Sequence, residues 1–155
     1  MPSGIKQAFA SRLTDVDSVA REQLGVLRFE GNKVYKYVNF KNATATVAAG
    51  AGSLVAYAST ALSGYVANRV VSDNTDADAA VHAAGATLAT IAGVAGTDYY
   101  CWIQIKGAIT LDIAVGSGAA GSPFYLTATD KTAAIMSAVT QQKAGVSINA
   151  TTSVA

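Results

Sequence analysis

Charged residues are scarce in this sequence. They make up 14% of the 155 residues, whereas about a quarter is usual for a soluble protein. Hydrophobic residues make up 51%, which excludes intrinsic disorder as a description of the whole chain. About a fifth of the residues are alanine and 14 are glycine, while aromatic residues make up only 8%. A surface so poor in charge indicates that other subunits cover part of it, so the composition favours an assembling structural protein over a freely diffusing enzyme.

The chain has only one cysteine, Cys101, and only one histidine, His82. A single cysteine excludes an internal disulfide, and a zinc site needs several Cys or His ligands. The two residues could form a nucleophile–base pair. However, the alternating pattern places Cys101 on the apolar face of a strand, and no clear carboxylate beyond Asp78 orients His82. We therefore expect neither enzymatic activity nor a cofactor.

Long hydrophobic runs are absent as well. No stretch of about 18 consecutive strongly apolar residues occurs, so we expect no membrane-spanning helix and no membrane partner. The first ten residues lack the apolar core of a signal peptide, which predicts a protein made in the cytoplasm without a secretory route of its own. The net charge of +1 and the isoelectric point near 7.8 give no electrostatic reason to expect a nucleic-acid partner.

Residues 1–24 differ in pattern from residues 25–155. Seven of the eleven basic residues lie in the first 41 positions. Thr14-Asp15-Val16-Asp17 resembles a helix N-cap with acids in the first turn, and apolar residues recur at near-helical spacing up to Leu24. A helix of two or three turns is marginal alone, so it must dock on its own domain, a neighbour or a partner. We divide the chain into an N-terminal arm that could include this helix and a β-rich domain.

From Gly25 onward the pattern has a period of two, which is typical of β-strands. Glu30-Gly31-Asn32 is a short turn that predicts a hairpin with its neighbours on both sides. Residues 73–84 indicate a loop or a short helix ended by Gly85. Strands are predicted at 26–29, 33–40, 53–57, 64–72, 87–94, 99–106, 109–115, 123–127 and 145–148. Many short strands with glycine-rich turns predict an all-β fold, a single β-sandwich or barrel-like domain with a short N-terminal arm or helix.

Two motifs each have a simpler interpretation. Residues 116–121 match the G-x-G-x-x-G pattern of dinucleotide-binding proteins, but an extended segment follows where a helix would be needed, so a strand-connecting loop is favoured. Asp73, Asp76 and Asp78 could bind a hard cation, although their spacing departs from the calcium loop of EF-hands. A solvated acidic turn is the default interpretation there, and cation binding stays open.

The aromatic residues are more informative. Tyr100 and Trp102 share the mixed face of one predicted strand with Lys106, and Tyr35 and Tyr37 share a face of the hairpin. Aromatic residues among basic ones can stack nucleic-acid bases, but the chain has no dense basic groove. Tyrosine and tryptophan are enriched at protein interfaces, while packing around the sandwich core is an equal alternative. The candidate capsid or subunit interface residues are Phe9, Arg12, Arg21, Tyr35, Tyr37, Tyr65, Tyr100, Trp102 and Lys106.

The order of several segments is similar to that of a known family. These segments are Gln-Leu-Gly-Val at 23–26, Gly-Asn-Lys-Val-Tyr-Lys-Tyr-Val at 31–38, Gly-Ser-Leu-Val-Ala-Tyr at 52–57, Ile-Ala-Gly-Val-Ala at 91–95, Tyr-Tyr-Cys-Trp-Ile-Gln-Ile-Lys-Gly at 99–107 and Ala-Gly-Ser-Pro-Phe-Tyr-Leu at 120–126. Together they resemble the small head-decoration, or capsid cement, proteins of tailed bacteriophages. The resemblance covers residues 23 to 148.

The resemblance implies a β-rich body that adds to the outside of an assembled capsid, often as a homotrimer, and bridges copies of the phage major capsid protein. The family offers no catalytic residues to carry over. We expect residues 1–24 to dock on the capsid or on a neighbouring copy. Another virion component, such as a head fibre base or a tail protein, is the alternative, and a secreted adhesin-like β module is a weaker one.

Overall fold

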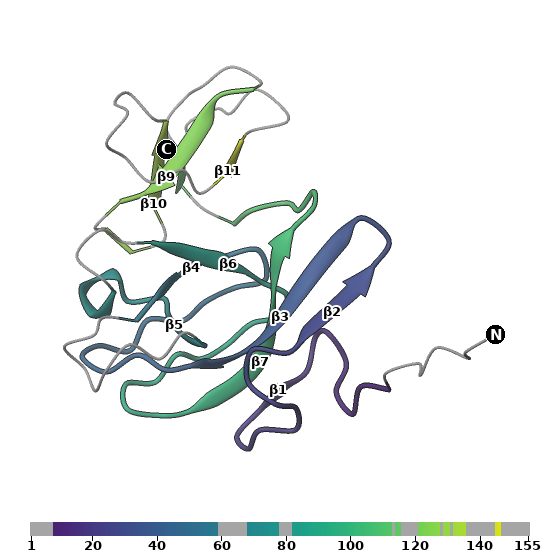
Figure 1. Cartoon of the computed structure of the whole chain (residues 1–155). Helices are drawn as coiled ribbons and strands as arrows, with labels where there is room; N and C mark the ends of the chain where they lie inside the picture. Colours follow the sequence, from purple (N-terminus) through teal and green to yellow (C-terminus); the bar gives the residue numbers. More distant parts are fainter. Residues whose placement is uncertain are drawn as a thin grey trace.

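The computed structural model describes residues 8–58, 68–77, 82–112, 114–115, 121–127, 129–130, 132–135 and 145–146. Its elements in chain order (Figure 1) are β1 (Val16–Asp17), β2 (Leu27–Glu30), β3 (Lys33–Phe40), β4 (Leu54–Tyr57), β5 (Arg69–Val71), the 3-10 helix η2 (Asn74–Asp76), β6 (Ala83–Thr87), β7 (Tyr99–Lys106), β8 (Ala114–Val115), β9 (Pro123–Leu126), β10 (Thr132–Ile135) and β11 (Gly145–Val146). The strands form a seven-stranded sheet and a four-stranded sheet.

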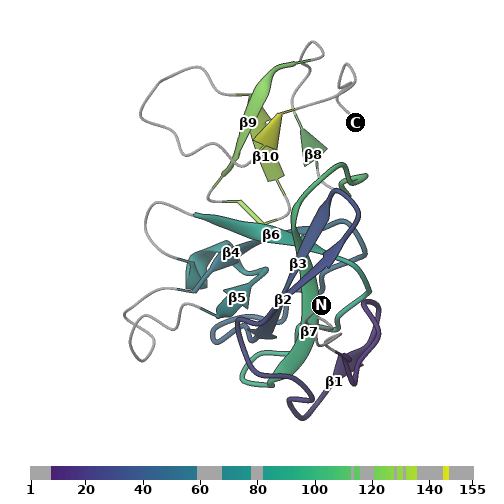
Figure 2. The ribbon, with the colours of Figure 1, turned by 45° about the vertical axis from the view of Figure 1, so that its right-hand side comes forward.

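The larger sheet closes on itself. Its order is β1-β7-β6-β4-β5-β3-β2, and β7 also pairs with β3. The strands β3, β5, β4, β6 and β7 therefore form a closed five-stranded barrel, in which only β3 and β5 run parallel. β1 adds to β7 and β2 adds to β3 outside this ring, as Figures 1 and 2 show. The predicted all-β, barrel-like fold is confirmed.

The inside of the barrel is an apolar core because alternate residues of each strand face inward. Val38 lies opposite Cys101 in the β3–β7 register, and both belong to this core with Phe40 and Ile103. Cys101 is 3% exposed, and burial raises the pKa of its thiol to about 12. The prediction that this cysteine packs on the apolar face of a strand is confirmed.

The four-stranded sheet, with the order β11-β9-β10-β8, covers an outer face of the barrel. Phe124 and Leu126 of β9 pack in one cluster with side chains of β4, β5 and β6. Asn74 joins the two sheets, because its side-chain amide donates hydrogen bonds to the carbonyl oxygens of Thr127 and Thr129 at 2.7 and 3.0 Å. In both ribbon views the small sheet lies beside β4 and β6 (Figures 1 and 2).

The helix predicted within residues 14–24 is not formed. Val16 and Asp17 form β1 and pair with Cys101 and Tyr100 of β7. The carboxylate of Asp15 accepts a hydrogen bond from the backbone N–H of Arg12 at 2.8 Å, a local contact that competes with helical hydrogen bonding. A short sequence with weak helix preference gains more from pairing with the available edge of β7 than from an isolated helix.

The strand predicted at 87–94 is displaced, since β6 covers Ala83–Thr87 and includes Gly85, which was expected to end a helix or loop. A Cβ atom at Gly85 would lie 2.7 Å from the carbonyl oxygen of Gln104. The glycine is therefore needed where β6 approaches β7 and closes the barrel. The sequence pattern carries no sign of this long-range approach.

The strand predicted at 109–115 is also wrong over most of its length, because residues 109–112 lie outside any strand and only β8 falls within the range. Ile109 and Leu111 are half-buried against the cluster beneath the small sheet. Their alternation reflects packing of a connecting segment. Of the strand predicted at 64–72, β5 is formed, while residues 59–67 lie outside the described residues, as does 116–120 of the glycine-rich motif.

Candidate interaction surface

The aromatic candidates lie on the outer face of β3 and β7. Tyr35, Tyr37 and Trp102 are 5%, 0% and 1% exposed. The N-terminal segment covers them with partly buried apolar side chains, namely Phe9, Leu13, Leu24 and Val26. We call this group, together with Tyr100 and Leu88, the aromatic cluster. It is a second core on the outside of the barrel.

Ring contacts and one hydrogen bond fix the centre of this cluster. The Trp102 ring makes edge-on contacts with Phe9 and Tyr37, each with 5.2 Å between ring centroids. Its indole Nε1–H donates to Ser11 Oγ at 2.9 Å. The guanidinium of Arg28 lies 5.0 Å from the centre of the Phe9 ring, within the range of a cation–π interaction. The indole is therefore both packed and satisfied.

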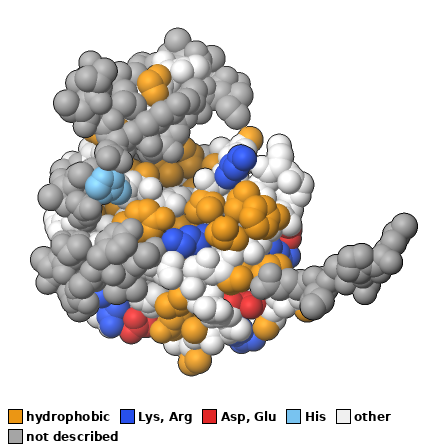
Figure 3. Space-filling view, viewed as in Figure 1, with side chains coloured by type: hydrophobic (Ala, Val, Ile, Leu, Met, Phe, Trp, Pro, Cys, Tyr) orange, Lys and Arg blue, Asp and Glu red, His pale blue; other side chains and the backbone are white. Residues whose placement is uncertain are grey.

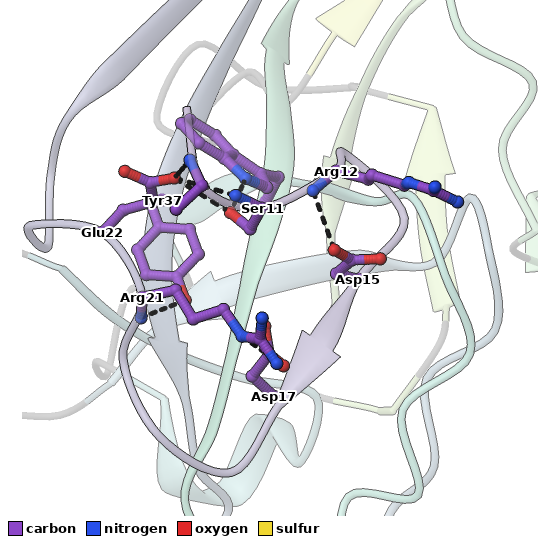
Figure 4. Close-up of polar contacts among 9 residues, drawn as sticks. Ser11, Arg12, Asp15, Asp17, Arg21, Glu22 and Tyr37 are labelled. Carbon is purple, nitrogen blue, oxygen red and sulfur yellow. Dashed lines mark hydrogen bonds and ion pairs between the residues drawn. The ribbon is translucent and has the colours of Figure 1, made fainter. Parts of the chain in front are cut away.

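Polar contacts hold the N-terminal segment together and attach it to the barrel (Figure 4). The Glu22 carboxylate accepts hydrogen bonds from the backbone N–H groups of Ala10 and Ser11 at 2.6 and 3.1 Å. The Tyr37 hydroxyl accepts one from the backbone N–H of Arg21 at 3.1 Å. Burial of Tyr37 raises the pKa of its hydroxyl above the ordinary value. Residues 8–24 thus pack on the chain's own barrel in this structure.

The structure brings together five of the nine candidate interface residues. These five are Phe9, Tyr35, Tyr37, Tyr100 and Trp102. Arg21 touches the cluster through its backbone, Arg12 and Lys106 are exposed, and Tyr65 lies outside the described residues. Packing within the chain, the alternative that the sequence left open, accounts for Trp102. A role of these residues in a subunit contact stays a prediction.

A different surface carries exposed large apolar side chains, and the sequence reasoning missed it. Leu27 and Phe29 on β2 are 39% and 69% exposed, and Ile105 on β7 is 40% exposed. Leu27 lies opposite Lys36, which in turn lies opposite the inward-facing Ile103. We call Leu27, Phe29 and Ile105 the hairpin patch. It lies on the same side of the sheet as the barrel core, where the hairpin extends past the closed ring of strands. Figure 3 shows hydrophobic side chains gathered over β2 and β3 on this side.

The hairpin patch borders a shallow, open depression with a volume of about 590 Å³, lined by residues that include Leu27, Lys36, Tyr57 and Ile105. The Lys36 ammonium lies 5.2 Å from the centre of the Tyr57 ring, and burial raises the pKa of the Tyr57 hydroxyl. This site offers apolar contact with a cationic edge. The alternation of Leu27 and Phe29 with charged residues on a hairpin arm is the signal that could have indicated it.

The aspartates at 73 and 76 do not form a solvated turn, so that expectation is wrong. Each is 1% exposed. Asp73 accepts a hydrogen bond from the N–H of Ala45 at 3.1 Å, and Asp76 accepts from Ala43 and Thr44. Burial pushes the pKa of Asp76 upward, but these hydrogen bonds outweigh burial, so the pKa lies below the ordinary value. The carboxylates hold the loop after β3, while residue 78 lies outside the described residues.

No family model, curated protein or solved structure matches the chain. Among the described residues there is no group of three or more His, Cys, Asp or Glu side chains placed to hold a metal ion. No helix in the described part of the chain is long and apolar enough to cross a membrane.

Proposed function

We propose that this chain is a structural virion protein that binds the outside of an assembled phage capsid and stabilises it by bridging capsid subunits. The order of the segments that resemble decoration proteins supports this proposal. The observation that carries it is the hairpin patch, where large apolar side chains lie exposed on a chain with few charges. Exposed apolar groups clustered in this way mark interaction surfaces.

The chemistry of the patch defines the partner surface. Leu27, Phe29 and Ile105 supply apolar contact area. Lys106 lies opposite Val34 in the β3–β7 register, and Lys33 packs near Gly107, so both lysines lie at the same end of the hairpin. The complementary surface on the major capsid protein is apolar and edged by carboxylates.

Stabilisation follows from mass action. A protein that binds the assembled lattice and not the dissociated subunits shifts the equilibrium toward the lattice. Bridging two capsid subunits, or binding as an oligomer, multiplies the effect through a high effective concentration. The buried polar side chains fit a structural role, because Asp73 and Asp76 are engaged in loop hydrogen bonds. The proposed role requires neither catalysis nor a cofactor.

The test is co-sedimentation of the protein with undecorated capsids of tailed bacteriophages. Ile105→Ser, in the hairpin patch, should weaken capsid binding about tenfold or more, because a buried Ile side chain contributes roughly 1.5–3 kcal/mol. Val94→Ser is the matched control, since Val94 is 44% exposed and Ile105 is 40% exposed. The control should bind like the wild type.

Two outcomes count against the proposal in different ways. Wild-type protein that does not sediment with capsids at any concentration contradicts capsid binding, and its recovery with tails instead would favour a tail component. Equal binding by wild type and Ile105→Ser contradicts the hairpin patch as the contact while leaving the capsid as partner.

A further inference from the structure

β2 is the edge of the barrel sheet. Within the described part of the chain it pairs with β3 alone. The Val26 carbonyl accepts a hydrogen bond from the N–H of Tyr37 at 3.0 Å. Hydrogen-bonded and non-bonded pairs alternate along an antiparallel ladder, so Arg28 is a bonded pair with Tyr35, and Leu27 and Phe29 direct their N–H and C=O groups away from β3. Such an edge is a template for another strand.

The side chains of β2 divide by face. Leu27 and Phe29 lie on the face of the hairpin patch, while Arg28 and Glu30 lie on the opposite face, where Arg28 Nε donates to Glu30 at 2.8 Å. The strand therefore carries a positive and a negative charge two residues apart, with Phe29 between them. This order is self-complementary when it is reversed.

We infer that β2 pairs antiparallel with β2 of a second copy of the chain across a two-fold axis that passes beside Phe29. The outward N–H and C=O groups of Phe29 then bond to those of Phe29 in the second copy. Arg28 of each copy lies opposite Glu30 of the other, which gives two opposite-charge contacts related by the axis.

Charge favours this register over the two others that the edge groups permit. Leu27 opposite Leu27 of the second copy places neither Arg28 nor Glu30 opposite a charge, and Leu27 opposite Phe29 places Arg28 opposite Arg28. Like charges directly opposite each other destabilise an antiparallel pair. Registers shifted by one residue are excluded because they would set outward-pointing groups against inward-pointing ones.

The pairing has two structural consequences. It joins the two hairpin patches on one face, with the Phe29 rings adjacent, so that a single pair presents a doubled apolar surface. It also ends with two copies, because the contact is isologous and the β2 edge of each copy is occupied by the other. The expected species in dilute solution is a dimer, which departs from the trimer that the family resemblance implies. This inference does not depend on capsid binding.

Charge variants test the pairing. Arg28→Glu makes the edge wholly acidic and Glu30→Arg makes it wholly basic. Each variant alone should dimerise about tenfold or more weakly than the wild type in analytical ultracentrifugation, because two attractive contacts become repulsive. Both variants lose the Arg28–Glu30 ion pair within the chain. An equimolar mixture should nevertheless restore dimers to the wild-type level, since every opposing pair is then of opposite charge.

The outcomes are decisive in both directions. A wild type that is monomeric at all concentrations overturns the inference, as does a trimer whose assembly neither variant affects. A mixture that associates no better than its components also overturns it. A thermal melt of each variant at low concentration identifies one that has merely lost its fold.

A cysteine pair gives a second test that does not alter the charges. Cys101 is the chain's one cysteine and is buried. In the inferred register the Cα atoms of two Phe29→Cys residues lie about 5.5 Å apart, within the range for a disulfide. Two Leu27→Cys residues lie about 14 Å apart along the strands. Mild oxidation should therefore link Phe29→Cys into dimers and leave Leu27→Cys monomeric. Linkage of Leu27→Cys alone, or only in a mixture of the two variants, would show one of the other registers and overturn the inferred one.

Discussion

The two faces of β3 and β7 differ in how they are covered. On the outer face, Tyr37 and Trp102 are buried beneath residues 8–26 of the same chain. On the opposite face, beyond the closed ring, Ile105 of β7 and Phe29 of the adjoining strand β2 are exposed. The same part of the sheet thus has one face that the chain itself covers and one apolar face that it leaves exposed.

The composition of each face explains the difference. The covered face combines rings with polar atoms that find partners, such as the indole N–H of Trp102 with Ser11 and the Tyr37 hydroxyl with Arg21. The uncovered face offers apolar side chains with lysines at its margin. Aromatic residues with polar tips are as useful for closing an internal contact as for a subunit interface, so residue type alone does not distinguish the two.

Trp102→Ala should give the largest difference in stability between the two faces. Removing a fully buried indole should lower the free energy of unfolding by about 3–5 kcal/mol. The same truncation on the other face, Phe29→Ala, should change it by less than about 1 kcal/mol when measured at concentrations low enough for the monomer, because Phe29 is 69% exposed in the single chain. Urea denaturation of both variants measures the contrast.

The result separates the two roles proposed for tryptophan. A small loss of stability combined with loss of oligomers would place Trp102 at a subunit contact and contradict its burial within the chain. Equal effects of the two truncations would remove the distinction between the faces.

Local signals in the sequence were sufficient for much of the fold. The hairpin at Glu30-Gly31-Asn32 is formed with β2 and β3 on either side of Gly31, whose φ of +59° suits a tight turn. The alternation at 99–106 gave β7 and the inward position of Cys101. Both features depend on neighbours in the chain, which a periodic pattern records.

The features that the sequence did not reveal depend on contacts between distant segments. Gly85 lies within β6 because the backbone of Gln104 approaches it, and Val16 joins a strand because the edge of β7 is available. The hairpin patch was missed for the same reason. In the sequence, Leu27 resembles any strand residue that faces a core. Only the pairing of distant strands shows that β2 lies outside the closed barrel, which leaves Leu27 exposed.

A smaller effect on the covered face should come from Ser11→Ala. Ser11 is 4% exposed and its hydroxyl accepts the hydrogen bond of the Trp102 indole. Removing it leaves a buried N–H without a partner, which should cost about 1–3 kcal/mol of unfolding free energy. Ser18→Ala, at an exposed position of the same segment, is the matched control and should be neutral. If the two variants are equally stable, the hydrogen bond does not hold the segment in solution.

Tyr37→Phe should have the smallest effect on stability, and it tests directly whether the N-terminal segment covers the Tyr37 hydroxyl. At pH 8 this variant should be less stable by about 1 kcal/mol, because the N–H of Arg21 loses its acceptor.

The difference in stability should also depend on pH. Burial raises the pKa of Tyr37 above its ordinary value of 10.0. The unfolded chain therefore releases this proton at lower pH than the folded chain, and the wild type loses stability as the pH rises above 10. Phenylalanine has no proton to release, so the gap between wild type and variant should narrow from pH 8 to pH 11 in urea denaturation. Cys101 and the other tyrosines are present in both proteins, so the comparison isolates the change at position 37. A constant gap would mean that the N-terminal segment leaves the Tyr37 hydroxyl open to water.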